Sequence, residues 1–397
     1  MHTETFLIYL SFCLFGLTNN ILYVVILSAA ADLVGPAAPK SIVLLFDIFP
    51  SFIIKLSCPL FIHLISYDMR IVLLVSFSFT GIFIISFFSS AGSYQSHLYL
   101  KLFGIALSSV SSGLGEVTFL QLTHFYQNNS LVGFSSGTGA AGLIGSFLYL
   151  LMTVHLRLSP RSALFSFSIT PFIYLIIYCF ILPRKDLYIN YSKLDNTNDT
   201  TIQKIKILIM PYMFPLSSVY FFEYLINQSI APTLLFDIYD SHKDHKFSFP
   251  YSVIFKFEKF RDIYVTYSTL YQIGVFISRT FSCYYQIDNL YIPFLLQVLN
   301  FLFCISQSIF FFIKIEKQFA LIFLLIFYEG LIGGSAYYNT YNKASKEIEI
   351  SKREFSIGAI SISDSIGIAF AALIGLWLEK ALCNYQINDG RDWCSLE

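Results

Sequence analysis

Charged residues are scarce in this chain. They make up 13% of its 397 residues, about half of the ~25% that is typical of soluble globular domains. Lys plus Arg and Asp plus Glu number 25 each, so the basic surplus of a nucleic-acid-binding protein is missing. Hydrophobic residues make up 56%, with 43 Phe and 27 Tyr, which excludes a disordered chain. This balance predicts a polytopic membrane protein.

The motifs of catalytic and nucleotide-binding sites are also missing. The chain has no G-x-S-x-G, no H-E-x-x-H and no Walker lysine motif. Its seven cysteines show no C-x-x-C spacing, which favours buried thiols over a metal site. Cys383 and Cys394 flank a polar tail and are placed to pair if that tail faces an oxidising compartment. We therefore expect no enzyme, no cofactor, no metal and no nucleic-acid partner.

Eleven apolar windows are long enough to cross a bilayer, which takes about 20 residues. They run over 5–32, 41–66, 70–90, 97–123, 131–154, 163–182, 207–230, 264–282, 290–313, 319–341 and 355–379. The window 264–282 is the weakest, because it contains Gln272, Arg279 and several Tyr and Thr residues. The first window has no Lys or Arg before it and is too long for a signal peptide.

A polar joint at 183–206 divides these windows into six and five. We expect a six-helix bundle over 1–182, a five-helix bundle over 207–382 with a long loop at 231–262, and a polar tail over 383–397. Short segments recur six windows apart: Ala141–Gly145 is similar to Ala371–Gly375, and Gly113–Gly115 to Gly330–Gly333. A parallel repeat of this kind is typical of the major-facilitator architecture. The predicted fold is therefore all-α and major-facilitator-like, with about 11 transmembrane helices in two pseudo-repeated bundles (6+5).

The charges in the joints favour a cytoplasmic N-terminus. In that orientation the inner joints contain ten Lys and Arg and the outer segments eight, leaving out the long loop. The excess is small but has the sign that the positive-inside rule requires. Asn190 and Asn198 are glycosylation sequons in the joint that this orientation places in the cytosol, so glycans there would reverse it.

Polar side chains inside the first two windows are candidates for function, because burying them in lipid is costly. Asn19 and Asn20 lie in the middle of the first window. Their amides suit a substrate hydroxyl or phosphate, and suit equally a hydrogen bond between helices. Asp47 and Lys55 lie on either side of Pro50 in the second window. We expect them to form a structural ion pair, with Arg279 as the other candidate partner of Asp47; a moving proton site is the alternative.

Two acids stand out as candidates for proton coupling, and the first of them, Glu116, is also a candidate for substrate binding. Glu116 follows a run of Ser and Gly residues in the fourth window, where close helix packing leaves it in a crowded, partly desolvated place. Asp364 lies at the centre of the eleventh window. For both residues, a hydrogen-bonded structural role is the alternative.

The remaining candidates lie in the fifth, seventh, eighth and tenth windows. Glycines at 137, 139, 142 and 145 predict close helix packing. Arg279 is the residue expected to receive an anionic group, because its planar fork fits phosphate or carboxylate; snorkelling to the interface is the alternative. The other candidate binding residues have amide or carboxylate side chains: Asn227, Gln228, Gln272 and Glu329, with Glu223 beside them.

Eight segments, in order along nearly the whole chain, resemble the battenin family. They are Phe15–Ala30, Asp47–Lys55, Ser111–Leu120, Ser135–Gly139, Tyr224–Gln228, Tyr271–Arg279, Tyr328–Gly334 and Ile362–Asp364. The resemblance implies a lysosomal or vacuolar membrane protein with a major-facilitator-like fold. The roles implied are export of glycerophosphodiesters, transport of basic amino acids and control of organelle pH. The chain departs from the family in a short 183–206 joint without an acidic dileucine signal, a longer 231–262 segment and an extended tail.

Three hypotheses follow. In the first, a secondary transporter binds a small polar solute between its halves: Arg279 takes an anionic group, the amides and Glu329 bind the rest, and Glu116 and Asp364 couple protons. In the second, the acids Glu116, Glu223, Glu329 and Asp364 bind arginine or lysine. In the third, the protein is a membrane scaffold that regulates trafficking or a proton pump, and its polar groups pair off completely.

Overall fold

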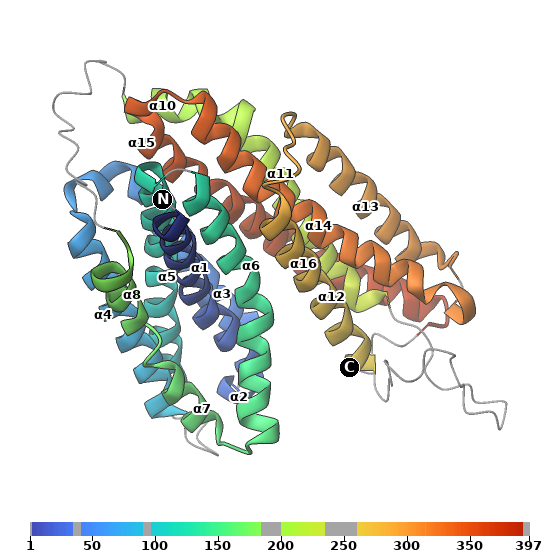
Figure 1. Ribbon diagram of the computed structural model, residues 1–397. Coiled ribbons are helices and arrows are strands. Elements are labelled where there is room, and N and C mark those ends of the chain that lie inside the picture. Colours follow the sequence, from blue (N-terminus) through green and yellow to red (C-terminus); the bar gives the residue numbers. More distant parts are fainter. Residues whose placement is uncertain are drawn as a thin grey trace.

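The chain folds into two bundles of helices that lie side by side (Figure 1). The computed structural model describes residues 2–34, 41–89, 97–126, 128–183, 200–234, 260–313 and 315–391, and no strand occurs among them. Ten stretches of this part are long and apolar enough to cross a membrane. The helix α12 (Phe260–Phe281), of 22 residues, is more polar and makes the eleventh. The expected number of membrane helices is thereby confirmed.

The two bundles follow one another in the sequence. The N-terminal bundle contains α1 (His2–Ser28), α2 (Ala30–Val34), α3 (Ser41–Phe61), η2 (Ile62–Leu64), α4 (Tyr67–Phe88), α5 (Leu98–Tyr126), α6 (Asn128–Leu150), η3 (Leu151–His155), α7 (Pro160–Phe167), α8 (Phe172–Ile176) and η4 (Ile177–Ile181). The C-terminal bundle contains α10 (Thr201–Leu208), η5 (Ile209–Met213), α11 (Phe214–Leu225), η6 (Ile226–Ile230), η7 (Ala231–Thr233), α12, α13 (Tyr291–Phe310), α14 (Ile315–Glu347), α15 (Ile350–Ile360) and α16 (Ile362–Asn388).

Several helix boundaries differ from those expected. The window 319–341 continues to Glu347, and the window 355–379 is two helices that meet at Ser361. The window 163–182 is also broken, by turns between α7 and α8 that include Pro171, because proline removes a helical hydrogen bond. Most of the 183–206 joint, with both sequons Asn190 and Asn198, and most of the 231–262 loop lie outside the described residues.

The pattern of helix contacts repeats between the bundles. In the N-terminal bundle α1 packs on α6, α3 on α5 and α4 on α5; in the C-terminal bundle α11 packs on α16, α12 on α14 and α13 on α14. These are the same pairs, six spans later. Between the bundles, α6 contacts α12 and α3 contacts α16. These two contacts are equivalent: in each, the second span of one bundle meets the fifth span of the other. The repeat seen in short sequence matches is thus a repeat of the packing, as the major-facilitator architecture requires.

Glycines make the closest of these contacts possible. Gly137 of α6 lies directly against the Cys13 carbonyl of α1, and Gly367 of α16 lies against the Ser217 carbonyl of α11. A side chain at either position would collide with backbone. Lipid tails are as apolar as the side chains, so the hydrophobic effect does not drive helices together within a membrane. Van der Waals contact between backbones that approach closely at small residues supplies much of the packing energy instead. The prediction that the fifth-window glycines serve helix packing is confirmed.

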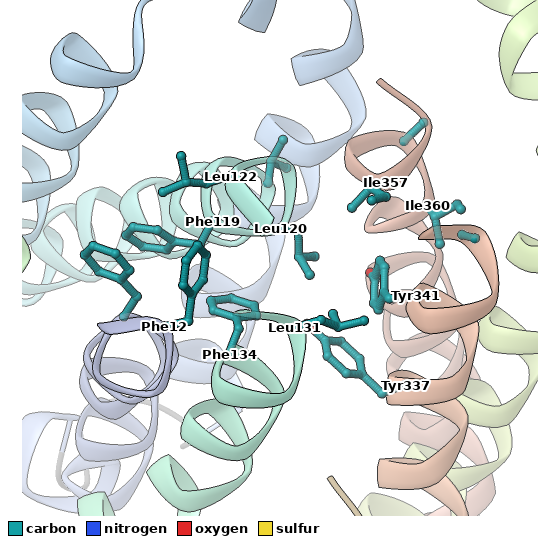
Figure 2. Packing of buried hydrophobic residues seen from close by; sticks show 14 of the residues in the cluster. Phe12, Phe119, Leu120, Leu122, Leu131, Phe134, Tyr337, Tyr341, Ile357 and Ile360 are labelled. Carbon is teal, nitrogen blue, oxygen red and sulfur yellow. The ribbon is translucent and has the colours of Figure 1, made fainter. Parts of the chain in front are cut away.

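The two bundles share one apolar core only at the end where α1 begins, called here the amino-terminal face. There, Leu120 and Leu131 of the N-terminal bundle face Tyr341 and Ile357 of the C-terminal bundle (Figure 2). Towards the opposite face, the described core residues form two separate clusters, one within each bundle. The structure is therefore a conformer in which the bundles are closed together at the amino-terminal face.

Candidate functional site

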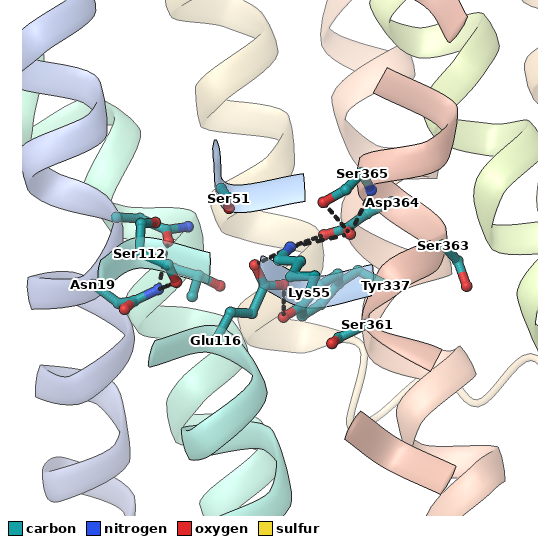
Figure 3. Close-up of polar contacts among 12 residues, drawn as sticks. Asn19, Ser51, Lys55, Ser112, Glu116, Tyr337, Ser361, Ser363, Asp364 and Ser365 are labelled. Carbon is teal, nitrogen blue, oxygen red and sulfur yellow. Dashed lines mark hydrogen bonds and ion pairs between the residues drawn. The ribbon is translucent and has the colours of Figure 1, made fainter. Parts of the chain in front are cut away.

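A buried lysine joins the two bundles near the middle of the membrane spans. Lys55 Nζ of α3 lies 2.6 Å from Glu116 Oε2 of α5 and 3.2 Å from each carboxylate oxygen of Asp364 of α16 (Figure 3). The side chain of Lys55 is 4% exposed. A charge at this depth is tolerable only with a partner of opposite sign. Lys55 has two such partners, one from each bundle.

Pro50 lies inside α3, just over one turn before Lys55. Because proline has no N–H, the helix lacks one backbone hydrogen bond there. The Ser109 hydroxyl of α5 donates to the Asp47 carbonyl at 2.5 Å and accepts from the Ser51 amide at 2.9 Å. In a regular helix those two backbone groups bond each other. The Ser109 side chain therefore fixes α3 against α5 at this point.

The expected ion pair between Asp47 and Lys55 is not formed, and this prediction was wrong. Asp47 is buried, makes no ion pair with any described residue, and its Oδ2 has no protein partner. The two residues are eight apart on one helix, a little over two turns, which is too far for neighbouring side chains of a helix to meet. Lys55 instead reaches acids on other helices, and Arg279 does not pair with Asp47 either.

Asp364 is positioned by the break in the eleventh span. It lies in the first turn of α16, just after Ser361 ends α15. Its Oδ1 accepts hydrogen bonds from the Ser365 amide at 2.6 Å and the Ser365 hydroxyl at 3.1 Å. A carboxylate is favoured at a helix N-terminus by the free amides and the dipole. The break therefore supplies local support for an acid that would otherwise be costly in a membrane span.

Tyr337 of α14 links this group to a second cation. Its hydroxyl donates to Glu116 Oε1 at 3.2 Å, and the guanidinium of Arg279 lies over its ring at 4.1 Å from the centroid. Lys55, Glu116, Asp364, Tyr337 and Arg279 are thus one connected set, called here the central cluster. It draws on both bundles.

Arg279 of α12 is held by neutral groups only. Its Nη1 donates to the Thr138 hydroxyl of α6 at 2.7 Å, and its Nη2 donates to the Tyr220 hydroxyl of α11 at 2.8 Å. Its Nε has no protein partner, and it forms no ion pair with any described carboxylate. It is placed between helices and not at the lipid interface. A permanently charged fork with neutral partners is suited to an anion.

The glycines of α6 make room for the polar side chains of α12. An added Cβ at Gly139 would lie 3.3 Å from Arg279 Cδ, and Gly142 lies directly against the amide of Gln272. The sequence predicted close helix packing at these glycines, and the structure shows which polar groups that packing brings in. Gln272 makes no hydrogen bond with any residue that the structure describes.

Acids of the C-terminal bundle form a second polar group. The Tyr271 hydroxyl donates to Glu223 Oε1, and Asn227 Nδ2 donates to Glu329 Oε1 at 2.9 Å. The second oxygen of each acid, Glu223 Oε2 and Glu329 Oε2, is buried without a protein partner. Asn227 lies in the π-helical turn η6, a type of turn that is frequent at functional sites.

The other amide candidates are placed differently. Asn19 is buried, donates to the Ser112 carbonyl at 3.1 Å and accepts from the Tyr174 hydroxyl at 3.3 Å, so it joins α1, α5 and α8. Of the two roles open to it, the geometry favours the hydrogen bond between helices. Asn20 accepts from Asn19 at 3.3 Å. Gln228 is exposed, because adjacent residues of a helix point in different directions and its neighbour Asn227 faces inward.

Sequence reasoning missed the hydroxyl groups of the site. Tyr337, Tyr220 and Tyr271 each contact a charged side chain, and so does Thr138. Tyrosine is so frequent in this chain that no single one stood out. A usable signal is the spacing on α11 and α14: Tyr220 lies one turn before Glu223, and Tyr337 lies two turns after Glu329, so each shares a helix face with an acid.

Replacing Lys55 by Met is expected to destabilise the protein strongly. It leaves Glu116 and Asp364 buried without a cation, which costs about 3–5 kcal/mol of unfolding free energy for a broken buried pair. Asp47→Asn, a matched buried substitution that breaks no ion pair, is expected to cost less. Neutralising both acids together with Lys55→Met (Glu116→Gln, Asp364→Asn) is expected to restore part of the loss. Thermal unfolding of the purified variants in detergent measures this, and equal effects of Lys55→Met and Asp47→Asn would contradict it.

Comparison with known structures shows the fold. A bacterial homologue of the iron transporter ferroportin, in an outward-facing state, aligns with a TM-score of 0.63 at 14% identity, covering 99% of this chain and 96% of that one. The human organic anion transporter MFSD10 aligns with a TM-score of 0.54 at 13% identity, covering 100% and 97%. The E. coli fucose:proton symporter FucP aligns with a TM-score of 0.52 at 15% identity, covering 97% and 98%. The fold is that of the major facilitator transporters.

Comparison of sequences shows the family. The family model described as CLN3 protein matches residues 10–200 and 188–385. The chain is 47% identical to protein BTN1 of Yarrowia lipolytica over 98% of both chains, and 43% identical to protein BTN1 of Saccharomyces cerevisiae over 100% of both. The chain belongs to the CLN3 (battenin) family.

Proposed function

We propose that the protein is a secondary transporter of a lysosomal or vacuolar membrane that exports small phosphodiesters, such as glycerophosphodiesters. The observation that carries this proposal is that the positive charge of Arg279 is not balanced by a contacting carboxylate among the described residues. Arg279 is the cation of the central cluster whose partners are all neutral, whereas the charge of Lys55 is matched by two acids. A phosphodiester has the charge and the planar pair of oxygens that its fork accepts.

The groups around Arg279 suit the rest of such a solute. Thr138 and Tyr220 already hold the guanidinium in place, so little side-chain entropy remains to be lost when the phosphate binds. The amides of Asn227 and Gln272 and the carboxylate of Glu329 are available for hydroxyl groups. Asn19 is committed between helices and takes no part, while Asn20 and Gln228 stay as secondary candidates. No cofactor enters this account.

Glu116 and Asp364 are assigned to proton coupling. They lie on opposite bundles and share the single amino group of Lys55. A proton taken up by one of them removes its attraction to Lys55 and leaves the other pair intact. Protonation of Asp364 therefore weakens an ionic contact between the bundles, and the bundles can then rock around the site. A transporter that takes protons from an acidic lumen also contributes to organelle pH.

A second candidate function is the transport of basic amino acids. The observation in its favour is the pair of unpartnered oxygens, Glu223 Oε2 and Glu329 Oε2. A fully buried carboxylate with a free oxygen is expensive as an anion, so either a proton or a cationic solute must neutralise it. The scaffold hypothesis expects complete pairing of the polar groups, and the free atoms of Asp47, Glu223, Arg279 and Glu329 count against it.

Arg279→Gln is expected to lower glycerophosphodiester flux at least about tenfold, the loss that corresponds to one charge-assisted hydrogen bond of 1.5–3 kcal/mol. Arg279→Lys is expected to retain part of the flux, because it keeps the charge and loses the fork. Uptake into vesicles reconstituted with the purified protein measures both, with Lys380→Gln, an exposed residue of α16, as the matched control. Undiminished flux in Arg279→Gln refutes the assigned role. Loss of arginine flux in Glu223→Gln, without any phosphodiester flux, supports the second candidate.

The proposed orientation has the N-terminus in the cytosol and the C-terminus in the lumen. With eleven spans the two termini lie on opposite sides of the membrane. Cys383, near the end of α16, is disulfide-bonded, whereas the other five described cysteines are thiols. Disulfides persist in oxidising compartments, so the face opposite to the amino-terminal face is assigned to the lumen. Cys394, the predicted partner of Cys383, lies outside the described residues.

This orientation predicts that the natural protein has no N-linked glycans. Of the four sequons, Asn190 and Asn198 belong to the connection between η4 and α10, Asn128 begins α6 at the amino-terminal face, and Asn227 lies in η6 within a span. Treatment with an endoglycosidase is expected to leave the electrophoretic mobility unchanged. Lys246→Asn creates the sequon Asn-Phe-Ser in the connection between η7 and α12, on the other face, and is the positive control. A mobility shift of the natural protein, with none for the control, reverses the orientation.

A further inference from the structure

A pocket lies at the amino-terminal face, on the seam between the two bundles. Thr123 and His124 of α5, Tyr341 and Ser345 of α14, and Arg353 of α15 line it, together with apolar side chains of α6 and α15. It shares no residue with the central cluster. On α14, the ring of Tyr341 packs edge-on against that of Tyr337 at 4.9 Å between centroids, so the pocket lies one helical turn from the central cluster.

Two buried polar atoms at this pocket have no partner among the residues that the structure describes. Tyr341 is 0% exposed, and its hydroxyl makes no hydrogen bond within that part of the chain. His124 Nδ1 is likewise buried without a partner there. Leaving such groups unsatisfied costs about 1–3 kcal/mol each, and nearly all buried polar groups in native proteins are paired. Two of them on opposite bundles, at one pocket, indicate a ligand.

The charge of the pocket gives the sign of that ligand. Arg353 donates from Nε and Nη2 to the Ile348 carbonyl, at 3.2 and 3.1 Å, and its Nη1 is not used in these bonds. No carboxylate is among the lining residues. The neighbouring Glu354 accepts from the Tyr67 hydroxyl at 2.6 Å. Arg353 is therefore the charged side chain among the lining residues, and the donors that face the pocket are its guanidinium nitrogen, the phenol of Tyr341 and, in the donating tautomer, the imidazole of His124.

We propose that this pocket binds a phosphate-type oxyanion. Because residues of both bundles would hold the anion, binding stabilises the conformer that is closed at the amino-terminal face and opposes its opening. The anion is therefore an inhibitor of opening from the cytosolic side. Its source is either free phosphate or the phosphate group of a transported diester, and only the second source rests on the proposed function.

The test uses the full-length protein, purified in detergent, with Arg279→Gln in every sample so that the central cluster contributes no anion site. Inorganic phosphate is titrated by calorimetry and by thermal unfolding, against potassium chloride at equal ionic strength. We expect saturable binding and a rise in melting temperature with phosphate alone. Tyr341→Phe is expected to weaken binding about five- to tenfold without lowering the melting temperature of the phosphate-free protein, because it removes a hydroxyl that has no partner.

Further variants separate the pocket from its surroundings. Arg353→Gln is expected to abolish binding, while Lys352→Gln, the neighbouring base outside the pocket, leaves it unchanged. Repeating the titration with glycerophosphoglycerol identifies the source: tighter binding than phosphate assigns the pocket to the transported solute, and weaker binding assigns it to free phosphate. Absence of saturable phosphate binding, or equal affinity in Tyr341→Phe, overturns the proposal. Transport by the protein with natural Arg279 is measured separately, so either proposal can fail alone.

Discussion

The cost of placing charge inside a membrane governs this structure. Lys55 is tolerated in α3 because Glu116 of the same bundle and Asp364 of the other bundle both contact it. The same contacts hold the two bundles in register at mid-membrane. The break at Ser361 serves this arrangement, because it places Asp364 in the first turn of α16.

The pairing of charged side chains is uneven between the two bundles. Lys55 and its acids satisfy one another, and Asn19 is engaged between helices. Among the described residues, an unpartnered atom lies on Asp47 in the N-terminal bundle, and three lie on Arg279, Glu223 and Glu329 in the C-terminal bundle. The proposed solute site therefore draws mainly on the C-terminal bundle. Because a shared apolar core closes the amino-terminal face, the proposed transporter would take up its solute from the opposite face.

Hydropathy and the six-span repeat were sufficient to predict the fold, because eleven lipid-length windows and small residues at helix crossings are local features of the sequence. The partners of the polar residues were not predictable in the same way. Asp47 and Lys55 are near each other in sequence, yet Lys55 pairs with Asp364, 309 residues away, since that contact exists only after the bundles meet. The tyrosines around Arg279 were hidden by their frequency. Residue types therefore indicated which side chains matter, and only the packing shows what each one contacts.

The central claim is that the guanidinium of Arg279 binds an anion at the junction of the two bundles. A cryo-electron microscopy structure of the full-length protein with glycerophosphoglycerol tests it most directly. The account predicts density for the phosphate within hydrogen-bonding distance of the Arg279 guanidinium, with Thr138 and Tyr220 beside it. Solute density against Glu223 and Glu329 and away from Arg279, or a guanidinium that pairs with a carboxylate in the bound state, would contradict it.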